Sequence, residues 1–121
     1  MLTKVKGAAS PRIDCTPAEW EMRVDLACAY RLVAHFGWHQ LIYNHLTARV
    51  PGPEVHFLIN PFGLMYREIT ASNLLKIDLD GNKLTPSPHP VLQAGFVVHR
   101  SVHMCREDVA PAYGDRNCRI T

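Results

Sequence analysis

The sequence lacks several features that would each define a class of protein. Its four cysteines, Cys15, Cys28, Cys105 and Cys118, form no CxxC pair, and isolated cysteines in an intracellular chain are mostly small buried hydrophobic residues. We therefore expect neither a disulfide nor a structural zinc site. No apolar run is long enough to cross a bilayer, and the first residues contain no signal-peptide core. These absences predict a cytoplasmic protein outside the membrane.

Concentrated charge of one sign is also missing. The 13 basic and 11 acidic residues give a net charge of +2 and are scattered along the chain. Nucleic acids and anionic membranes are bound by clustered positive charge, so neither is expected as a partner. With 121 residues and 47% hydrophobic content, the chain is sized for one domain, which buries roughly 65% of the surface that its unfolded form exposes.

The strongest local signal is a helix start. Thr16 is suited to cap the helix, Pro17 to occupy its first position, and Glu19 to reach back and complete a capping box. Gly37 provides a left-handed stop. The sequence therefore predicts one amphipathic helix over residues 17–36. Its apolar positions at helical spacing are Met22, Leu26, Ala29, Val33 and Phe36.

Structural roles are expected for the charged residues of this helix. Glu19 and Arg23 are one turn apart and can form an ion pair. His35 falls in the last turn, where a positive charge interacts favourably with the helix dipole. We favour this role for His35 over ligand binding.

Three short runs predict strands of a sheet. Residues 46–50 and 55–59 flank the turn-prone Pro51-Gly52-Pro53, so the chain should double back there. The alternating run 75–79 leads into Asp80-Gly81, a favoured two-residue hairpin turn. We interpret the acidic residues of this turn as solvated hairpin residues and not as paired catalytic carboxylates.

A polar cluster stands at the entrance to the first strand. Asn44, His45 and Thr47 can offer donors to an anionic group, although such residues at a loop-strand junction commonly satisfy nearby backbone groups. After the second strand, Gly63 allows a positive φ and the close approach of a ligand. These positions are the candidate binding residues.

A second helix is predicted over residues 92–106, after a proline-rich loop at 85–90. His99 and His103 stand four residues apart, a spacing that can place two imidazoles on one metal. The pair lacks the glutamate of an HExxH motif and has no evident third ligand. We therefore favour ordinary helix-face histidines and keep the metal pair as the alternative.

Three segments together resemble the N-terminal part of the class II aldolase/adducin family: AYRLVAHFGWHQLIYNHLTARV, HFLINPFGLMYREITASNLLKIDLDGN and QAGFVVHRSVHMCREDV. The resemblance implies an α/β fold, a three-layer α/β/α sandwich around a mostly antiparallel sheet that is incomplete at its C-terminal end. It divides the chain into a flexible N-terminus (1–15), a partial domain (16–109) and a divergent tail (110–121). We expect a truncated family member, with a frameshift as a hypothesis for the tail.

In the sugar-phosphate enzymes of that family, a Gly-Asn-x-Ser loop, a Thr-Gly turn and a Ser-Ser-Glu segment hold the substrate phosphate and supply the acid/base. These motifs fall on residues 44–47, on Phe62-Gly63 and on Gln93-Ala94-Gly95, so the carboxylate is missing. The enzymes' His-x-His metal pair falls near Gly114-Asp115-Arg116, where no histidine occurs. These departures resemble the adducin-like branch.

The resemblance therefore implies a non-catalytic or degenerate domain without a cofactor, which acts through association with copies of itself or with a related subunit. The first alternative is an aldolase or epimerase that acts on a small sugar phosphate with zinc or another divalent metal. The second is an adducin-like module that associates with actin.

Overall fold

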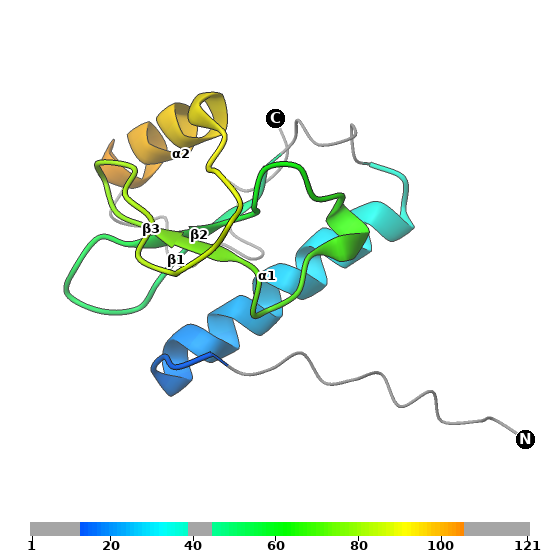
Figure 1. Cartoon of the computed structure of the whole chain (residues 1–121), viewed down its shortest axis with the longest axis horizontal. Helices are drawn as coiled ribbons and strands as arrows, with labels where there is room; N and C mark the ends of the chain where they lie inside the picture. The colour runs from blue at the N-terminus through cyan, green and yellow to red at the C-terminus, as the bar shows by residue number, and fades with distance from the viewer. Residues whose placement is uncertain (1–12, 39–44, 106–121) are drawn as a thin grey trace, which may run out of the picture.

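The computed structural model describes residues 13–38 and 45–105. Within these ranges the chain forms two α-helices, one short 3₁₀ helix and three strands (Figure 1). In chain order they are α1 (Pro17–His35), β1 (Thr47–Arg49), β2 (Phe57–Ile59), η1 (Tyr66–Glu68), β3 (Leu75–Ile77) and α2 (Gln93–Cys105).

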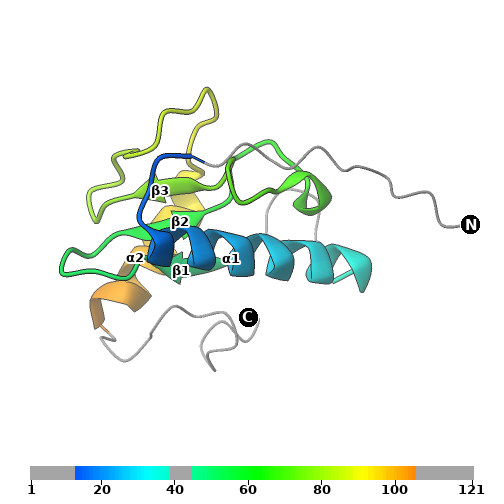
Figure 2. The same ribbon diagram turned by 90° about the horizontal axis from the view of Figure 1, so that it is seen from below.

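The strands form one antiparallel sheet in the order β1-β2-β3. Ala48 lies opposite Leu58, which lies opposite Lys76. Because successive strand residues point to opposite faces, this row faces α1 and the rows beside it face α2. Figures 1 and 2 show α1 and α2 on opposite sides of the sheet. The described part is therefore layered helix, sheet, helix.

Each face of the sheet has its own hydrophobic core. On the α1 side, the buried residues are Leu26, Ala27, Tyr30, Ala48, Val50, Leu58, Tyr66, Ile69 and Leu74. On the α2 side, they are Phe57, Ile59, Leu75, Ile77 and Phe96. Burial of one such large side chain contributes about 1.5–3 kcal/mol, so both helices are fixed to the sheet by apolar contacts.

The local signals of α1 are largely confirmed. The Thr16 hydroxyl accepts a hydrogen bond from the Glu19 N–H at 3.1 Å, and Gly37 has a φ of 71° just after the helix. The second half of the predicted capping box is wrong, because both oxygens of the Glu19 carboxylate accept hydrogen bonds from Arg23 and Lys76 instead. These bonds draw Glu19 toward the sheet.

The predicted hairpins are also present. β1 and β2 pair across the Pro51-Gly52-Pro53 segment, although each strand is shorter than predicted. After Asp80-Gly81 the chain returns through a single bridge between Ile77 and Lys83. The Asp78 carboxylate accepts hydrogen bonds within this turn, including two from Asn82 at 2.9 and 3.0 Å, so its role is to hold the turn.

Arg23 is the most deeply buried charged residue among those described, with an exposed fraction of 0%. Its Nε donates to Glu19 Oε1 at 3.0 Å, and one terminal nitrogen donates to the carbonyls of Leu74 at 2.8 Å and Ala71 at 3.2 Å. The other terminal nitrogen donates to Thr85 Oγ1 at 3.2 Å. Arg23 thus joins α1 to the segments before and after β3.

The Glu19 carboxyl has a pKa below its ordinary value of 4.5. Burial is the largest single effect and raises this pKa, but the hydrogen bonds and charges of Lys76 and Arg23 together outweigh it. Since the folded pKa is the lower one, ionised Glu19 stabilises the fold above about pH 4.5, and this stabilisation is lost as the pH falls further.

We therefore expect Glu19→Gln to reduce the loss of unfolding free energy that occurs between about pH 4.5 and pH 3. The measurement is urea unfolding followed by circular dichroism from neutral pH downward. Glu54→Gln, at an exposed loop position, is the matched control and should keep the wild-type acid dependence. An equally steep loss in Glu19→Gln would contradict the role given to this carboxylate.

Two predictions about burial are wrong. Phe36 is 57% exposed, because the inward face of α1 runs through Glu19, Arg23 and Tyr30 and ends before it. Cys28 and Cys105 are exposed, and Cys15 is half-buried; all three are free thiols. Cys118 lies outside the described residues. No helix within the described ranges is long and apolar enough to span a membrane.

Candidate functional site

Two histidines from distant parts of the sequence meet where β1 begins. His45 lies two residues before this strand begins, and His99 lies on α2. Their ring centroids are 6.2 Å apart with the planes at 85°, an edge-to-face arrangement. The contact joins the start of the sheet to the helix that covers its second face.

Thr47 is the residue that connects His99 to the sheet. Its hydroxyl oxygen lies 2.8 Å from His99 Nδ1, within hydrogen-bond distance. Thr47 is the neighbour of Ala48, and strand alternation turns it toward α2 while Ala48 faces α1. Thr47 is only 1% exposed, so the Thr47 end of this hydrogen bond is buried, while His99 is half-buried.

His45 is held from the other side by Asn60, the residue directly after β2. His45 Nδ1 lies 3.0 Å from Asn60 Oδ1, which is also 3.0 Å from the Tyr30 hydroxyl. The same hydroxyl accepts from the Leu46 N–H at 2.8 Å and contacts the Leu46 carbonyl. Tyr30 therefore fixes both the backbone beside His45 and the amide that orients its ring.

Asn60 retains an unused donor. Asn60 is 2% exposed, and its Nδ2 is buried without a hydrogen-bond partner among the residues that the structure describes. An unpaired buried amide nitrogen costs about 1–3 kcal/mol. The inner wall of the site thus contains a polar atom that no described residue satisfies.

Gly95 closes the site from α2. A Cβ at this position would lie 2.5 Å from His45 Cδ2 and 2.7 Å from His45 Nε2, closer than real Cβ atoms approach other heavy atoms. The His45 ring therefore occupies the space that any side chain at position 95 would need. Glycine is the residue that this packing permits.

The candidate residues that the sequence indicated do not all lie in this site. His45 and Thr47 lie in the site, but each contacts a side chain, Asn60 or His99, and not only the backbone. Gly63 has the predicted positive φ, 100°, and lies exposed with open space around it. Asn44 and the side chain of His103 lie outside the described residues, so the alternative of a metal pair at His99 and His103 is not tested.

Sequence reasoning missed Tyr30 and Asn60. Tyr30 falls within the helical apolar pattern and resembles an ordinary core residue, and its hydroxyl gives no separate signal. Asn60 was available as a clue, because an asparagine directly after an apolar strand is placed to direct its amide toward neighbouring loops. The contact of His99 with Thr47 joins residues too far apart in the sequence for any local pattern to indicate.

The described residues do not provide a ligand set for the divalent metal of the enzyme alternative. Among residues 13–38 and 45–105, no group of three or more histidine, cysteine or acidic side chains is placed to hold a metal ion. His45 and His99 each use Nδ1 in a contact with another side chain, and no histidine follows position 103. The site is a pair of imidazoles with amide and hydroxyl partners.

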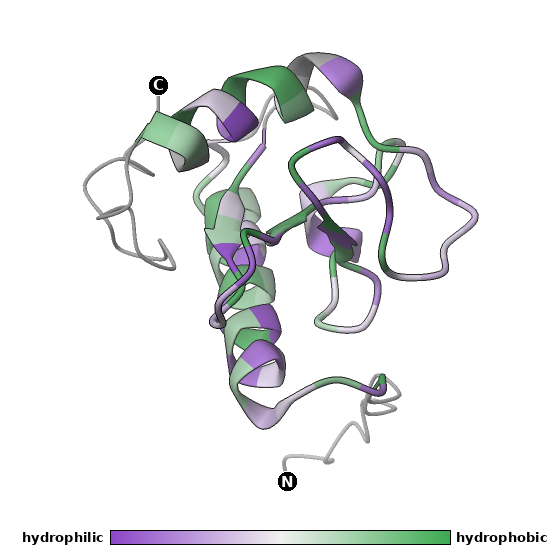
Figure 3. Ribbon diagram, turned by 90° about the vertical axis from the view of Figure 1, so that its left-hand side faces the viewer, coloured by the Kyte–Doolittle hydropathy of each residue, from purple (hydrophilic) through white to green (hydrophobic). Residues whose placement is uncertain are grey.

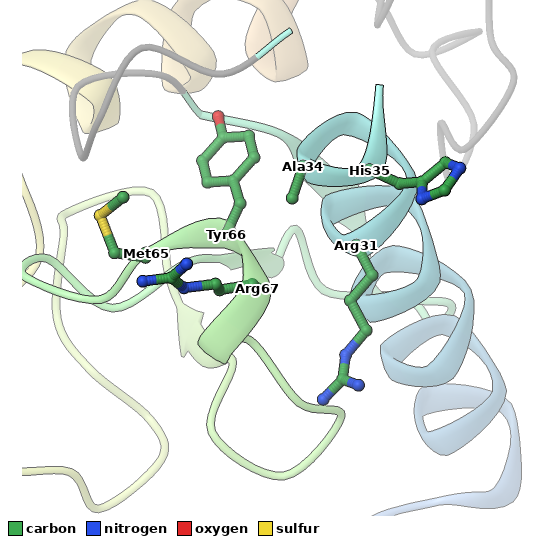
Figure 4. A pocket seen from close by; sticks show the side chains of 6 residues that line it. All are labelled: Arg31, Ala34, His35, Met65, Tyr66 and Arg67. Carbon is green, nitrogen blue, oxygen red and sulfur yellow. The ribbon is translucent and has the colours of Figure 1, made fainter. Parts of the chain in front are cut away.

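A hollow lies on the opposite side of the sheet from this site, between α1 and η1 (Figure 4). Its volume is about 380 Å³. The Tyr66 ring packs edge-on against Tyr30 at 4.6 Å, and burial raises the pKa of its hydroxyl. Figure 4 shows that Arg31 and Arg67 extend in different directions, so their charges do not converge on one ligand. The lining residues are Arg31, Ala34, His35, Met65, Tyr66 and Arg67.

Helices on both faces of an antiparallel sheet, with a polar site where β1 meets α2, define a mixed α/β domain. Residues 24–111 match the model of the Class II Aldolase and Adducin N-terminal domain, and the chain belongs to this family. A Caulobacter vibrioides protein with a provisional class 2 aldolase name is 56% identical over 91 residues. Mouse alpha-adducin is 49% identical over 89 residues.

Solved structures agree with this membership. An aldolase II superfamily protein from Pseudomonas syringae matches 78% of this chain with a TM-score of 0.75 and 53% identity. The L-fuculose 1-phosphate aldolase from Glaciozyma antarctica matches 82% of it with a TM-score of 0.71 and 30% identity.

The chain covers only a small share of the length of each relative. The chain spans 35% of the Caulobacter protein and 12% of alpha-adducin. It covers 38% of the Pseudomonas syringae structure and 42% of the Glaciozyma antarctica one. The matches therefore cover less than half of the length of each of these relatives.

Proposed function

We propose that this domain is a non-catalytic member of the family that acts by associating with copies of itself or with a related subunit. The observation that carries the proposal is the contact between His45 and Gly95. The resemblance aligns Gly95 with the glutamate that moves the proton in the family's enzymes. Here that position has no carboxylate, and the His45 ring occupies the space that the Cβ of a glutamate would need.

Exposed apolar surface supports the association. On α2, Val97 is 55% exposed, Val98 62% and Met104 54%. Figure 3 shows hydrophobic bands along α2 that alternate with hydrophilic ones. Contiguous apolar side chains in water favour contact with another protein surface. Within residues 45–105, β1 pairs with β2 alone, and such an edge favours association as well.

The likeness to a larger structure supports a further part of the proposal. Because the chain covers 38% of the Pseudomonas syringae structure, we infer that the described layers are the first part of a three-layer α/β/α sandwich. A related subunit that supplies the remaining strands would cover the exposed surface. A second copy of this chain would do so by another arrangement.

An enzyme is the second candidate, favoured by the structural likeness to an L-fuculose 1-phosphate aldolase. It would cleave or epimerise a small sugar phosphate with a divalent metal, and both the metal ligands and the acid would have to come from a partner. The 49% identity to alpha-adducin favours an actin-associated module as the remaining alternative.

The test combines three measurements on the purified full chain. Light scattering after size-exclusion chromatography gives the mass, elemental analysis gives the metal content, and a coupled assay with added Zn²⁺ or Mn²⁺ detects cleavage of ketose 1-phosphates. We expect a discrete oligomer without bound metal or turnover. About one metal ion per chain, or turnover that a chelator abolishes, would overturn the proposal.

A further inference from the structure

Two aromatic side chains stand exposed at the C-terminal end of α1. Phe36 is 57% exposed and Trp38 is 61% exposed. Their rings are stacked, with centroids 5.0 Å apart and planes at 24°. His35 extends the aromatic surface, because its ring centroid lies 5.2 Å from that of Phe36. Stacking hides only one face of each ring, so contact with another molecule would remove further apolar area from water.

The end of the helix holds this aromatic pair in place. The Gly37 N–H donates to the Ala34 carbonyl at 3.1 Å. The Trp38 N–H donates to the Val33 carbonyl at 3.0 Å. Together with the positive φ of Gly37, these two hydrogen bonds form a Schellman motif. The backbone of Trp38 is thus fixed to the last turn of α1, and less conformational entropy is lost when a partner covers the rings.

The hollow between α1 and η1 adjoins the aromatic pair, since His35 belongs to both (Figure 4). Among the described residues that line the hollow, Arg31, His35 and Arg67 are basic and none is acidic. Arg31 Nε donates to the Ile69 carbonyl at 3.1 Å. Neither arginine forms an ion pair with a described residue. The surface beside the aromatic pair therefore carries positive charge that the described part of the chain does not neutralise.

Glu68 is the acidic residue that follows Arg67 on η1, and its carboxylate has a local role. Its Oε2 accepts from the Met65 N–H at 2.6 Å, which closes the turn of η1, and the residue does not line the hollow. The acidic residues of α1 all lie in the first half of the helix. Positive charge therefore prevails where α1 ends.

We infer that this surface docks an acidic peptide segment of another protein, with an aromatic or aliphatic side chain of the peptide placed on Phe36 and Trp38. Tryptophan and arginine are residue types that dominate the binding energy of protein interfaces. Arg31 and Arg67 extend in different directions, so their charges suit carboxylates spaced along a peptide and not a single small anion. This docking patch consists of Arg31, Leu32, His35, Phe36, Trp38 and Arg67.

The experiment begins with selection of random peptides displayed on phage against the immobilised full chain. An enriched peptide is then synthesised with a fluorescent label, and its dissociation constant is measured by fluorescence polarisation. We expect the enriched peptides to combine several acidic residues with an aromatic or aliphatic one, and the affinity to fall as sodium chloride is added. Enrichment of peptides without acidic residues, or of none, would overturn the inference.

Variants of the full chain locate the binding surface. Trp38→Ala and Arg67→Glu should each raise the dissociation constant of the selected peptide by about tenfold or more, as expected of central interface residues. Arg67→Lys keeps the charge and should lose less affinity than Arg67→Glu. Leu84→Ala, which truncates a side chain that is 44% exposed elsewhere, is the matched control and should bind as the wild type does. A peptide that binds Trp38→Ala and Arg67→Glu as tightly as the wild type would overturn the inference, once circular dichroism confirms that both variants are folded.

Single-stranded nucleic acid is the other partner that stacked aromatic rings and arginines bind. An unlabelled oligothymidylate is therefore added to the labelled peptide complex. We expect no displacement, and displacement at concentrations below those of the unlabelled peptide would overturn the inference. The inference goes beyond the proposed function and can fail separately from it. A chain that is monomeric but binds the acidic peptide through this patch would overturn the association and leave the docking patch in place.

Discussion

Replacing Arg23 with methionine is expected to lower the free energy of unfolding by about 3–5 kcal/mol, the usual cost of removing one partner from a buried ion pair. Arg23 is fully buried, and its donors serve Glu19, two backbone carbonyls and Thr85. Methionine fills similar space but donates to none of them. Since a domain of this kind is stable by about 5–15 kcal/mol, the loss is a large share of the total.

Urea unfolding followed by circular dichroism measures this loss. Arg67→Met is the matched control, because Arg67 is exposed on η1, and it should change the stability by less than about 0.5 kcal/mol. A loss in Arg23→Met no larger than that of the control would show that the buried hydrogen bonds contribute little.

If Arg23→Met does not fold, a second variant keeps the prediction testable. Replacing the whole group by Glu19→Leu, Arg23→Met and Lys76→Met removes the two buried charges together with the half-buried Lys76, and the exchange of buried charged groups for apolar ones is often neutral or stabilising. We expect this triple variant to fold and to be more stable than Arg23→Met. A triple variant that is less stable than Arg23→Met would show that the loss of stability in Arg23→Met does not come from a charge left without its partner.

The second large effect concerns Gly95→Ala, which should destabilise this domain although it would stabilise an ordinary helix. Alanine has a helix propensity better than that of glycine by about 1 kcal/mol, so Gly95→Ala would stabilise an ordinary helix. Here the new Cβ would collide with the His45 ring, which Asn60 holds in place. Overpacking of this kind costs about 1–3 kcal/mol. We expect Gly95→Ala to destabilise the domain.

In a His45→Ala background the same substitution should be stabilising, because the ring is gone and only the helix propensity is left. A double-mutant cycle of the four proteins by urea unfolding measures the coupling. Stabilisation by Gly95→Ala with His45 present would mean that the ring moves aside readily. The proposal of a non-catalytic site would then lose its main observation, since a glutamate could also be accommodated.

Local chemistry explains which parts of the fold could be predicted from the sequence. Thr16, Pro17 and Gly37 fix the two ends of α1 through their own backbone and side-chain preferences. The Asp80-Gly81 turn fixes the last hairpin in the same way. The strands are shorter than the apolar runs that predicted them, because pairing with a neighbouring strand, and not hydrophobicity, defines where a strand ends.

The parts that escaped prediction depend on contacts across the fold. The sequence alone indicated that Glu19 and Arg23 would pair, but not that the pair would be buried, because Lys76 and the Leu74 carbonyl are brought to them by β3. The site has the same character. His45 and Thr47 were identified as polar residues at a strand entrance, yet their partners Asn60 and His99 come from elsewhere in the chain.

The position of Lys76 has a consequence for how the sheet is assembled. Its side chain points toward α1 and meets Glu19 at 2.8 Å, while its neighbours Leu75 and Ile77 pack toward Phe96. A slip of β3 by one residue would exchange these two faces. The ammonium group would then be driven among aromatic and aliphatic side chains, and Glu19 would lose its second cation. The ion pair with α1 and the burial of Leu75 and Ile77 therefore specify the same register of β3, so the first helix takes part in fixing the alignment of a strand more than 50 residues away.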